Sequence, residues 1–196
     1  AILAYCLNAD SVTIWKDVDG VLNADPRVFK KTTLLKQISY QEAIEMAFYG
    51  ASVIHPKTIK PLENKRIPLY VRSFENLENK GTTISKGVEL TPKISCFIVK
   101  KNQILVSISA KDFSFMVEKN LSYIFKLLHQ YKLKVNLIQN SAISFSVCLE
   151  DNYSNFTTFF NELTPSFNVR FNRNVTLFTI RHFDSKSIQE IEKKGT

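Results

Sequence analysis

Cysteine is scarce in this sequence, and the few cysteines present are far apart. Cys6, Cys96 and Cys148 each lie in an apolar or strand-like run. Neither a metal-ligand spacing nor a disulfide framework can be built from them, which is typical of proteins in a reducing cytoplasm. We therefore predict a cytoplasmic protein without a bound metal.

Long hydrophobic runs are also missing. No apolar run approaches the roughly 20 residues that a membrane-spanning helix needs. Residues 1–9 are apolar but carry no basic segment, so we do not interpret them as a signal peptide. The stretch 2–7 is typical of the end of a buried helix. The sequence therefore predicts no membrane partner, and we interpret the chain as a fragment of a longer protein.

Acidic residues are outnumbered by basic ones. The 18 aspartates and glutamates stand against 26 lysines and arginines, which gives a net charge of +8. An excess of positive charge favours anionic ligands such as ATP or nucleic acid. The lysines are scattered along the chain, so an ordinary solvated surface also explains the charge.

Histidines do not form a recognisable catalytic set. His55 precedes Pro56 and is interpreted as structural, His129 lies near the end of a predicted helix, and His182 ends a predicted strand. Neither a Ser/His/Asp set nor a metal cluster can be assembled around them. Histidine chemistry therefore predicts no function for this chain.

The sequence does contain a polar loop directly after a short β-branched run. Residues 12–15 predict a strand, and the loop that follows carries Asp17, Asp19, Asp25 and Arg27. In α/β domains, ligands bind where strands end and loops begin. The loop therefore predicts a phosphate, nucleotide or metal edge. A well-capped surface loop is the alternative, because Asp, Asn, Gly and Pro are also the residues that turns use.

The first half of the chain alternates helices with strands. Ser39 is predicted to cap a helix, with Glu42 as the partner three residues on. A second helix is predicted over 57–64 and a strand over 67–71. This alternation indicates part of an α/β layer. The polar stretch 76–87 is interpreted as a boundary or linker.

The second half has a more complete pattern. Strands are predicted over 94–99, 104–108, 134–138, 143–149 and 167–171, with helices from Val117 and over 156–163. From Ile104 onward the order is β-α-β-β-α-β, the split βαβ or ferredoxin-like arrangement. Asn174 is predicted to begin a new unit, with a strand over 175–181 and a helix over 187–193.

These motifs, in this order and spacing, resemble the aspartokinase family. The resemblance rests on Trp15–Arg27, Ser39–Ala43, Tyr49–Ala51, His55–Thr58, Ile67–Val71 and Gly81-Thr82. The first half is similar to the C-terminal part of the aspartokinase catalytic domain. The β-α-β-β-α-β unit is similar to the ACT regulatory module of that family. The resemblance covers essentially the whole chain.

The resemblance implies a fold class and domain boundaries. We expect an α/β fragment of an amino-acid-kinase domain, followed by an α+β ferredoxin-like (βαββαβ) ACT domain and an incomplete second ACT unit. The implied boundaries are 1–85 for the catalytic portion, 86–92 for a linker, 93–173 for the first ACT domain and 174–196 for the start of the second.

The resemblance also implies an activity. The family phosphorylates the β-carboxylate of L-aspartate with Mg-ATP, the first step toward lysine, threonine and methionine. The implied nucleotide contacts are Lys16, Asp17, Leu22, Arg27, Ser52 and Val53. Asp17 is expected to hold the ribose or order the loop, and Arg27 to face a phosphate. Relatives often have lysine at position 52, and we hypothesise that Lys16 compensates for its loss.

No catalytic residue is assigned within the chain. The Lys-Phe-Gly-Gly motif, the acidic substrate contact and the Arg-Gly-Gly-Ser-Asp segment of the family do not occur in residues 1–196. We therefore predict that these residues alone do not catalyse phosphoryl transfer. Fusion to a homoserine dehydrogenase and the oligomeric state are left open.

ACT modules pair side by side and bind an amino acid at the interface, so the resemblance implies a homodimer with lysine or threonine as effector. The implied contacts are Ser114, Val117, Asn120, Leu121, Val135, Asn136, Asn140, Ser141, Ala142 and Ile143. Their amides and hydroxyls suit a zwitterion, but residues 140–141 can equally form a plain hairpin turn. Asn136 and Ala142 replace the acidic groups of lysine-responsive relatives. Lysine, threonine, another ligand and no ligand all stay open.

Two other functions fit the sequence less well. A free-standing ACT module leaves the first 85 residues unexplained. A ferredoxin-like RNA binder needs aromatic-rich central strands. The predicted strand 143–149 has one aromatic, Phe145, on the face expected to pack on helices. We therefore predict no nucleic-acid partner.

Overall fold

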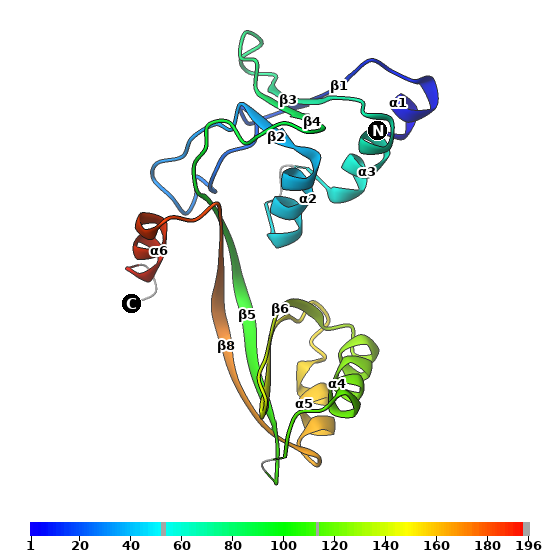
Figure 1. Cartoon of the computed structure of the whole chain (residues 1–196), viewed down its shortest axis with the longest axis vertical. Coiled ribbons are helices and arrows are strands. Elements are labelled where there is room, and N and C mark those ends of the chain that lie inside the picture. The colour runs from blue at the N-terminus through cyan, green and yellow to red at the C-terminus, as the bar shows by residue number, and fades with distance from the viewer. Residues whose placement is uncertain (52–53, 113, 194–196) are drawn as a thin grey trace. The chain divides into compact units, whose positions relative to one another are not determined.

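The computed structural model describes residues 1–51, 54–112 and 114–193 (Figure 1). The chain divides into two compact units. Unit 1 comprises Ala1–Val99 and Phe178–Thr196, and unit 2 comprises Lys100–Leu177.

Unit 1 is built on a mixed four-stranded sheet. The strands β1 (Val12–Lys16), β3 (Leu69–Ser73), β4 (Thr82–Ser85) and β2 (Gln37–Ser39) lie in that order across it. β1 and β3 are parallel, so their carboxyl ends meet at one edge. β4 runs antiparallel to β3, which brings its first residue to the same edge. The loop that follows β1 therefore begins at the same edge of the sheet as β4, with β3 between them.

The described residues of unit 1 form the helices α1 (Ile2–Leu7), α2 (Tyr40–Tyr49), α3 (Pro56–Lys65) and α6 (Ser185–Glu192). The predicted Ser39 cap of α2 is confirmed, because Ser39 Oγ accepts a hydrogen bond from Glu42 N at 3.0 Å. The Glu42 carboxylate, predicted as the capping-box partner, binds Arg181 and His182 instead. The core of unit 1 includes Leu35, Ile38, Met46, Ile59, Leu62, Leu69, Val71 and Ile84. Among the described residues, no helix is long and apolar enough to cross a membrane.

Helix α1 is present where we predicted it, but the prediction that it is buried is wrong. Leu3 and Leu7 are each 77% exposed. Ala4 is the only buried residue of α1. The apolar composition suggested burial, yet a helix of six residues turns only this one side chain to the unit 1 core.

The interpretation of residues 76–87 as a boundary or linker is wrong. They contain β4, an inner strand of the sheet, in which Thr82 and Ile84 are completely buried. A strand of four residues is too short to show a clear alternation in sequence. Gly81 allows the chain to enter β4 beside Val71. Its φ is +64°, and a Cβ there would lie 1.9 Å from Val71 O.

Unit 2 contains the β-α-β-β-α-β order predicted from Ile104 onward. Its elements are β5 (Cys96–Ala110), α4 (Glu118–Gln130), β6 (Lys134–Asn140), β7 (Ser144–Glu150), α5 (Phe156–Leu163) and β8 (Phe167–Arg181). The strands form one sheet in the order β6-β7-β5-β8, and β7 is antiparallel to both of its neighbours. The core includes Ile104, Val106, Ile108, Ile124, Leu128, Phe145, Val147, Phe156, Phe159 and Leu163.

Two predicted strand breaks are absent. The predicted strands 94–99 and 104–108 are one strand, β5, and 167–171 and 175–181 are one strand, β8. Asn102 and Asn174 each have a φ of 57° at these points. Asparagine tolerates this left-handed conformation, so each strand continues through a polar stretch typical of a turn. The start of a second ACT unit at Asn174 therefore falls inside β8, and its assignment to residues 174–196 stays a prediction.

Candidate functional site

The loop after β1 is fastened to the sheet edge by Thr82. Val21 N donates to Thr82 Oγ1 at 2.8 Å, and Thr82 Oγ1 donates to Leu35 O at 2.6 Å. One hydroxyl therefore holds both ends of the loop. Gly20 passes so close that a Cβ would lie 2.6 Å from Thr82 Oγ1, and its φ is +149°. The loop geometry consequently requires glycine at this position.

Asn23 closes the loop further along. Asn23 N donates to Thr33 O at 3.0 Å, and Thr33 N donates to Asn23 Oδ1 at 2.7 Å. Leu22 forms an antiparallel bridge with Leu34 beside them. The backbone of Leu22, a predicted nucleotide contact, is therefore held in place, and its side chain is half-buried.

The charged residues of the loop lie at its surface. Lys16 is half-buried at the end of β1, and Asp17 is exposed. Arg27, which we expected to face a phosphate, donates from Nη2 to Asp25 Oδ2 at 2.7 Å, and its side chain is 82% exposed. The hydrogen bond and charge of Asp25 raise the pKa of Arg27. An exposed ion pair is weak, so an anion can compete with Asp25 for this guanidinium.

The remaining predicted nucleotide contacts are not placed. Ser52 and Val53 lie outside the described residues. They follow the carboxyl end of α2, where Gly50 caps the helix with a φ of 121°. The structure therefore brings Lys16, Asp17 and Leu22 to one loop but does not test the second segment.

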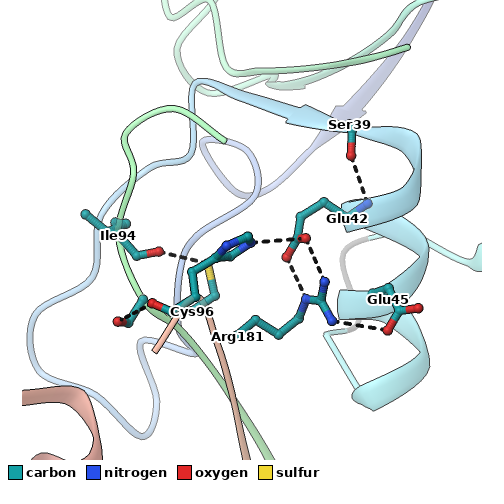
Figure 2. A network of polar contacts seen from close by, with 8 residues as sticks. Ser39, Glu42, Glu45, Ile94, Cys96 and Arg181 are labelled. Carbon is teal, nitrogen blue, oxygen red and sulfur yellow. Dashed lines mark hydrogen bonds and ion pairs between the residues drawn. The ribbon is translucent and has the colours of Figure 1, made fainter. Parts of the chain in front are cut away.

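A polar network that the sequence did not reveal lies at the amino end of α2 (Figure 2). Arg181 donates from Nε to Glu42 Oε1 at 2.7 Å and from Nη2 to Glu42 Oε2 at 2.8 Å. Its Nη1 reaches Glu45 Oε2 at 3.1 Å, and His182 Nε2 lies 3.1 Å from Glu42 Oε2. Arg181 and Glu42 are 139 positions apart. No local pattern predicts such a contact.

Burial and charge oppose each other in this network. Burial alone would raise the pKa of Glu42, but the hydrogen bonds and charge of Arg181, helped by His182, hold the pKa below its ordinary value. The hydrogen bond to Glu42 raises the pKa of Arg181 in turn. Burial next to Glu42 raises the pKa of the Cys96 thiol to about 12, so Cys96 stays protonated. The network is thus a stable ion pair beside an inert cysteine.

A pocket of about 560 Å³ lies next to the network. It is lined by Ser39, Glu42, Val88, Glu89, Leu90, Lys93, Ile94, Ser95, His182 and Asp184. Most of its charges are already paired: Glu89 binds Lys93 at 2.6 Å, and Asp184 caps α6. Among the described residues, no group of three or more His, Cys, Asp or Glu side chains is arranged to hold a metal ion.

In unit 2, one hydrogen bond joins the two stretches that we predicted to contact an effector. Met116 N, in the loop before α4, donates to Ala142 O at 2.9 Å. Ser141 N donates to Ser144 O at 2.8 Å, and the two hydroxyls lie 2.8 Å apart. Ser141 therefore forms the hairpin turn, the alternative that the sequence left open. Ile143 is 51% exposed beside it.

Asn136 does not present its amide to solvent. It is 7% exposed, at a bulge in β6 between Val135 and Leu137. Its Oδ1 accepts from Lys100 Nζ at 2.7 Å, and its Nδ2 donates to Gln103 Oε1 at 2.6 Å. Burial, with the nearby charge of Lys134, lowers the pKa of Lys100. The side chain of Asn136 is thus occupied by contacts within unit 2.

A second pocket, of about 590 Å³, includes two of the predicted effector residues. It is lined by Ala110, Lys111, Asp112, Ser114, Lys119, Asn120, Tyr123, Ser166 and Phe167. Val117 is 46% exposed, whereas Leu121 packs against the unit 2 core. Lys111 donates to Pro165 O at 2.8 Å and so links the two loops that border the pocket. The sequence did not indicate that the loop before β8, with Ser166, also lines this pocket.

Comparison with known proteins finds relatives that match large parts of the chain. A sequence model of the amino acid kinase family matches residues 1–73. The aspartokinase of Schizosaccharomyces pombe is 36% identical over 171 residues, covering 76% of this chain and 33% of that protein. The bifunctional aspartokinase/homoserine dehydrogenase of Buchnera aphidicola is 36% identical over 167 residues, covering 78% of this chain and 19% of that protein.

The chain is similar to aspartokinases over about three quarters of its length. The predicted resemblance is thereby confirmed. Solved structures of E. coli aspartokinase III, one with lysine and aspartate and one with aspartate and ADP, each match with a TM-score of 0.76 at 28% identity, covering 90% of this chain. The chain spans 40% of the first of these structures and 19% to 33% of the two relatives above.

Proposed function

We propose that this chain is the part of an aspartate kinase that carries the nucleotide-side loop and an amino-acid-sensing region. The complete reaction transfers a phosphoryl group from Mg-ATP to the β-carboxylate of L-aspartate, toward lysine, threonine and methionine. The observation that carries the proposal is the combination in one chain of the amino-acid-kinase match over residues 1–73 with the β-α-β-β-α-β unit that follows. A cytoplasmic location is part of the proposal.

The loop after β1 suits the nucleotide side of this reaction. Phosphoryl transfer depends mainly on positioning and on neutralisation of charge. Thr82 holds the loop backbone rigidly, and Lys16 stands where the loop leaves the sheet edge. We assign Lys16 to the phosphates or the ribose side of ATP, and Arg27 to a phosphate in exchange with Asp25. The ADP in a related E. coli structure supports nucleotide binding by the family.

Unit 2 suits an ACT regulatory module. Its sheet order, with two helices in the β-α-β-β-α-β connection, supports this assignment. β6 lies at an edge of the sheet and exposes Leu137 and Ile138, at 48% and 47%. Exposed apolar side chains on a strand with one open edge favour pairing with a second copy. We therefore propose a homodimer formed through unit 2.

The effector proposed for unit 2 is an amino acid, with threonine favoured over lysine. Asn136 Oδ1 already accepts from the ammonium of Lys100. The ε-ammonium of a bound lysine would compete with Lys100 for this acceptor and would face its like charge. The lysine complex of E. coli aspartokinase III keeps lysine as the second candidate.

Calorimetry tests the sensing part of this proposal. Threonine, lysine and methionine are titrated separately into the chain, and we expect heat of binding from threonine. A Ser114→Ala variant, altered in the pocket wall, should bind more weakly, whereas Ser122→Ala on the exposed side of α4 should not. Absence of heat from all three amino acids would remove the sensing function.

The nucleotide part is tested in an aspartate kinase that contains this chain. Lys16→Ala should raise the KM for ATP about fivefold to tenfold, the loss expected for one charge-assisted contact. Lys30→Ala, at an exposed position of the same loop, serves as the matched control. An unchanged KM for ATP in the Lys16 variant contradicts its assignment.

A further inference from the structure

The two strands that continue into unit 2 are each fastened, within unit 1, to a segment of the proposed nucleotide site. β5 begins at Cys96 and β8 ends at Arg181, and the two strands are neighbours in one sheet. The residues around these two strand ends contact the loop after β1 and helix α2. Because each strand is one continuous element, a displacement at one end of the strand can reach the contacts at its other end.

The first fastening, which we call the Asn23 anchor, consists of Asn23, Ser95 and Phe97. Asn23 Nδ2 donates to Ser95 O at 3.0 Å, and Phe97 N donates to Asn23 O at 2.7 Å. The ring of Phe97 stacks on buried Phe29 with 5.1 Å between centroids. Asn23 also closes the loop on itself and directly follows Leu22. The start of β5 therefore fixes a residue of the proposed nucleotide site.

The second fastening, which we call the Arg181 anchor, consists of Arg181, His182, Glu42 and Glu45. The guanidinium binds Glu42 through two hydrogen bonds and Glu45 through a third (Figure 2). These two carboxylates lie on the first turns of α2, whose far end leads along the chain into the predicted nucleotide segment at Ser52. The end of β8 therefore holds the helix that precedes this segment.

Further hydrogen bonds and burial stabilise the contacts of both anchors. Ser95 Oγ donates to His182 O at 2.8 Å, so the two anchors are joined to each other. Two-pronged pairs of arginine with a carboxylate are among the stronger protein hydrogen bonds. The Glu42 side chain is only 10% exposed, so loss of Arg181 would leave its buried charge with His182 alone beside it.

We propose that Asn23 and Arg181 are positioning residues that couple the state of unit 2 to the nucleotide-side loop and to α2. Our interpretation of this coupling as regulation of ATP binding by an amino acid rests on the proposed function. A displacement of β5 or β8 in unit 2 reaches the loop and α2 along the strand itself, without an additional contact. The anchors convert that displacement into movement of the proposed nucleotide site.

Hydrogen exchange of the chain, followed by mass spectrometry, tests the coupling without any ligand. Val147→Ala loosens the unit 2 core, where Val147 is 1% exposed. In the otherwise unchanged chain we expect this substitution to speed amide exchange in Trp15–Arg27 and in Tyr40–Gly50 about threefold or more, a coupling within the range measured for interacting sites. If Val147→Ala does not fold, Ile108→Val provides a milder loosening of the same core.

The anchor variants distinguish positioning from plain stabilisation. In an Arg181→Met background, Val147→Ala should no longer speed exchange in Tyr40–Gly50, and in an Asn23→Ala background it should no longer speed exchange in Trp15–Arg27. Arg170→Met removes the same kind of side chain from an exposed position of β8 and should preserve the effect. If Arg181 or Asn23 merely stabilised unit 1, its substitution would raise the basal exchange rate. The acceleration of exchange that Val147→Ala causes would then stay the same.

Two results overturn the coupling. One is acceleration by Val147→Ala confined to unit 2 in the otherwise unchanged chain. The other is an equal Val147→Ala factor with and without the anchors. Failure of ATP or amino-acid binding would instead remove the proposed function, and the exchange experiment contains neither ligand. The two failures are therefore distinguishable.

Discussion

The two units hold their candidate sites in different ways. In unit 1, single polar side chains make the decisive contacts: Thr82 fastens both ends of the loop, and Arg181 fastens α2. In unit 2, a core rich in phenylalanine lies under the sheet, with Phe145, Phe156 and Phe159 each no more than 1% exposed. Polar contacts thus set the geometry of unit 1, whereas apolar burial sets the stability of unit 2.

The two kinds of contact have different effects on the geometry of a site and on the stability of the fold. Hydrogen bonds depend on direction, so a few of them can fix a loop, although each adds only about 1 kcal/mol to the free energy of unfolding. Burial of a large apolar side chain has little directionality but contributes about 1.5–3 kcal/mol. Substitutions in unit 1 should therefore disturb the proposed nucleotide site before they unfold the unit, and core substitutions in unit 2 should do the reverse.

The largest effect is expected for Phe159→Ala. Phe159 is completely buried between α5 and the unit 2 sheet, so its truncation leaves a cavity and should lower the free energy of unfolding by about 3–5 kcal/mol. Urea unfolding followed by circular dichroism measures this loss. Phe115→Ala, at a position 68% exposed, should change the stability little. Similar losses in both variants would contradict the importance of the unit 2 core.

A smaller but pH-dependent effect is expected at Glu42. Because the pKa of Glu42 is lower in the folded protein than in the unfolded chain, its ion pair stabilises the fold above the unfolded value of about 4.3. This stabilisation is lost as the pH falls from there through the folded pKa. Arg181→Met should cost about 2 kcal/mol at pH 7, since the buried Glu42 then loses its arginine and keeps only His182.

The pH dependence of unfolding checks this sign. Glu42→Gln removes the titrating group, so its free energy of unfolding should fall less steeply than that of the unchanged chain between about pH 5 and 3. Glu190→Gln, at an exposed position of α6, is the matched control and should follow the unchanged chain. A Glu42→Gln curve parallel to that of the unchanged chain contradicts the prediction.

Thr82→Val should cost about 1–3 kcal/mol while preserving side-chain volume. The substitution leaves Val21 N and Leu35 O without their buried partner. Fluorescence of Trp15, the single tryptophan, which is 46% exposed near the end of β1, reports the change in the loop that follows. Thr83→Val, on the other face of β4, should leave the emission unchanged. An unshifted spectrum in both variants means that Thr82 does not hold the loop.

The smallest effect is expected for Asn136→Ala, about 1 kcal/mol. The substitution removes the acceptor of Lys100 and the donor to Gln103 from the interior of unit 2. Thermal unfolding measures the loss, and calorimetry with threonine should show unchanged affinity, because the Asn136 amide is already occupied. Loss of threonine binding with retained stability would instead assign Asn136 to the effector.

Local signals in the sequence predicted many of the elements. The cap at Ser39 and the second helix, observed as α3, depend on residues within a few positions of one another. The β-α-β-β-α-β order also follows from such patterns. Short or polar segments were misjudged for the same reason: β4 offers too few residues to show alternation, and Asn102 and Asn174 are typical of turns although both lie inside strands.

The candidate sites were predicted less completely than the fold. Family motifs indicated the loop after β1 and the two stretches that the hydrogen bond from Met116 to Ala142 brings together. They did not indicate that Asn136 is buried against Lys100, since a bulge in β6 decides which way this side chain points. Nor did they indicate the partner of Arg27, because Asp25 serves equally well as a turn residue and as an ion-pair partner.

By itself, the sequence determined the resemblance to aspartokinases, the order of most elements and the segments where chemistry is expected, because these depend on residue types at short and regular spacings. Only the tertiary structure decided which polar groups meet. Val21 and Thr82 are 61 positions apart, Asn23 and Ser95 are 72 apart, and Glu42 and Arg181 are 139 apart. A hydrogen bond at such separation exists only after the chain has folded, when sheet pairing brings distant residues within 3 Å of each other.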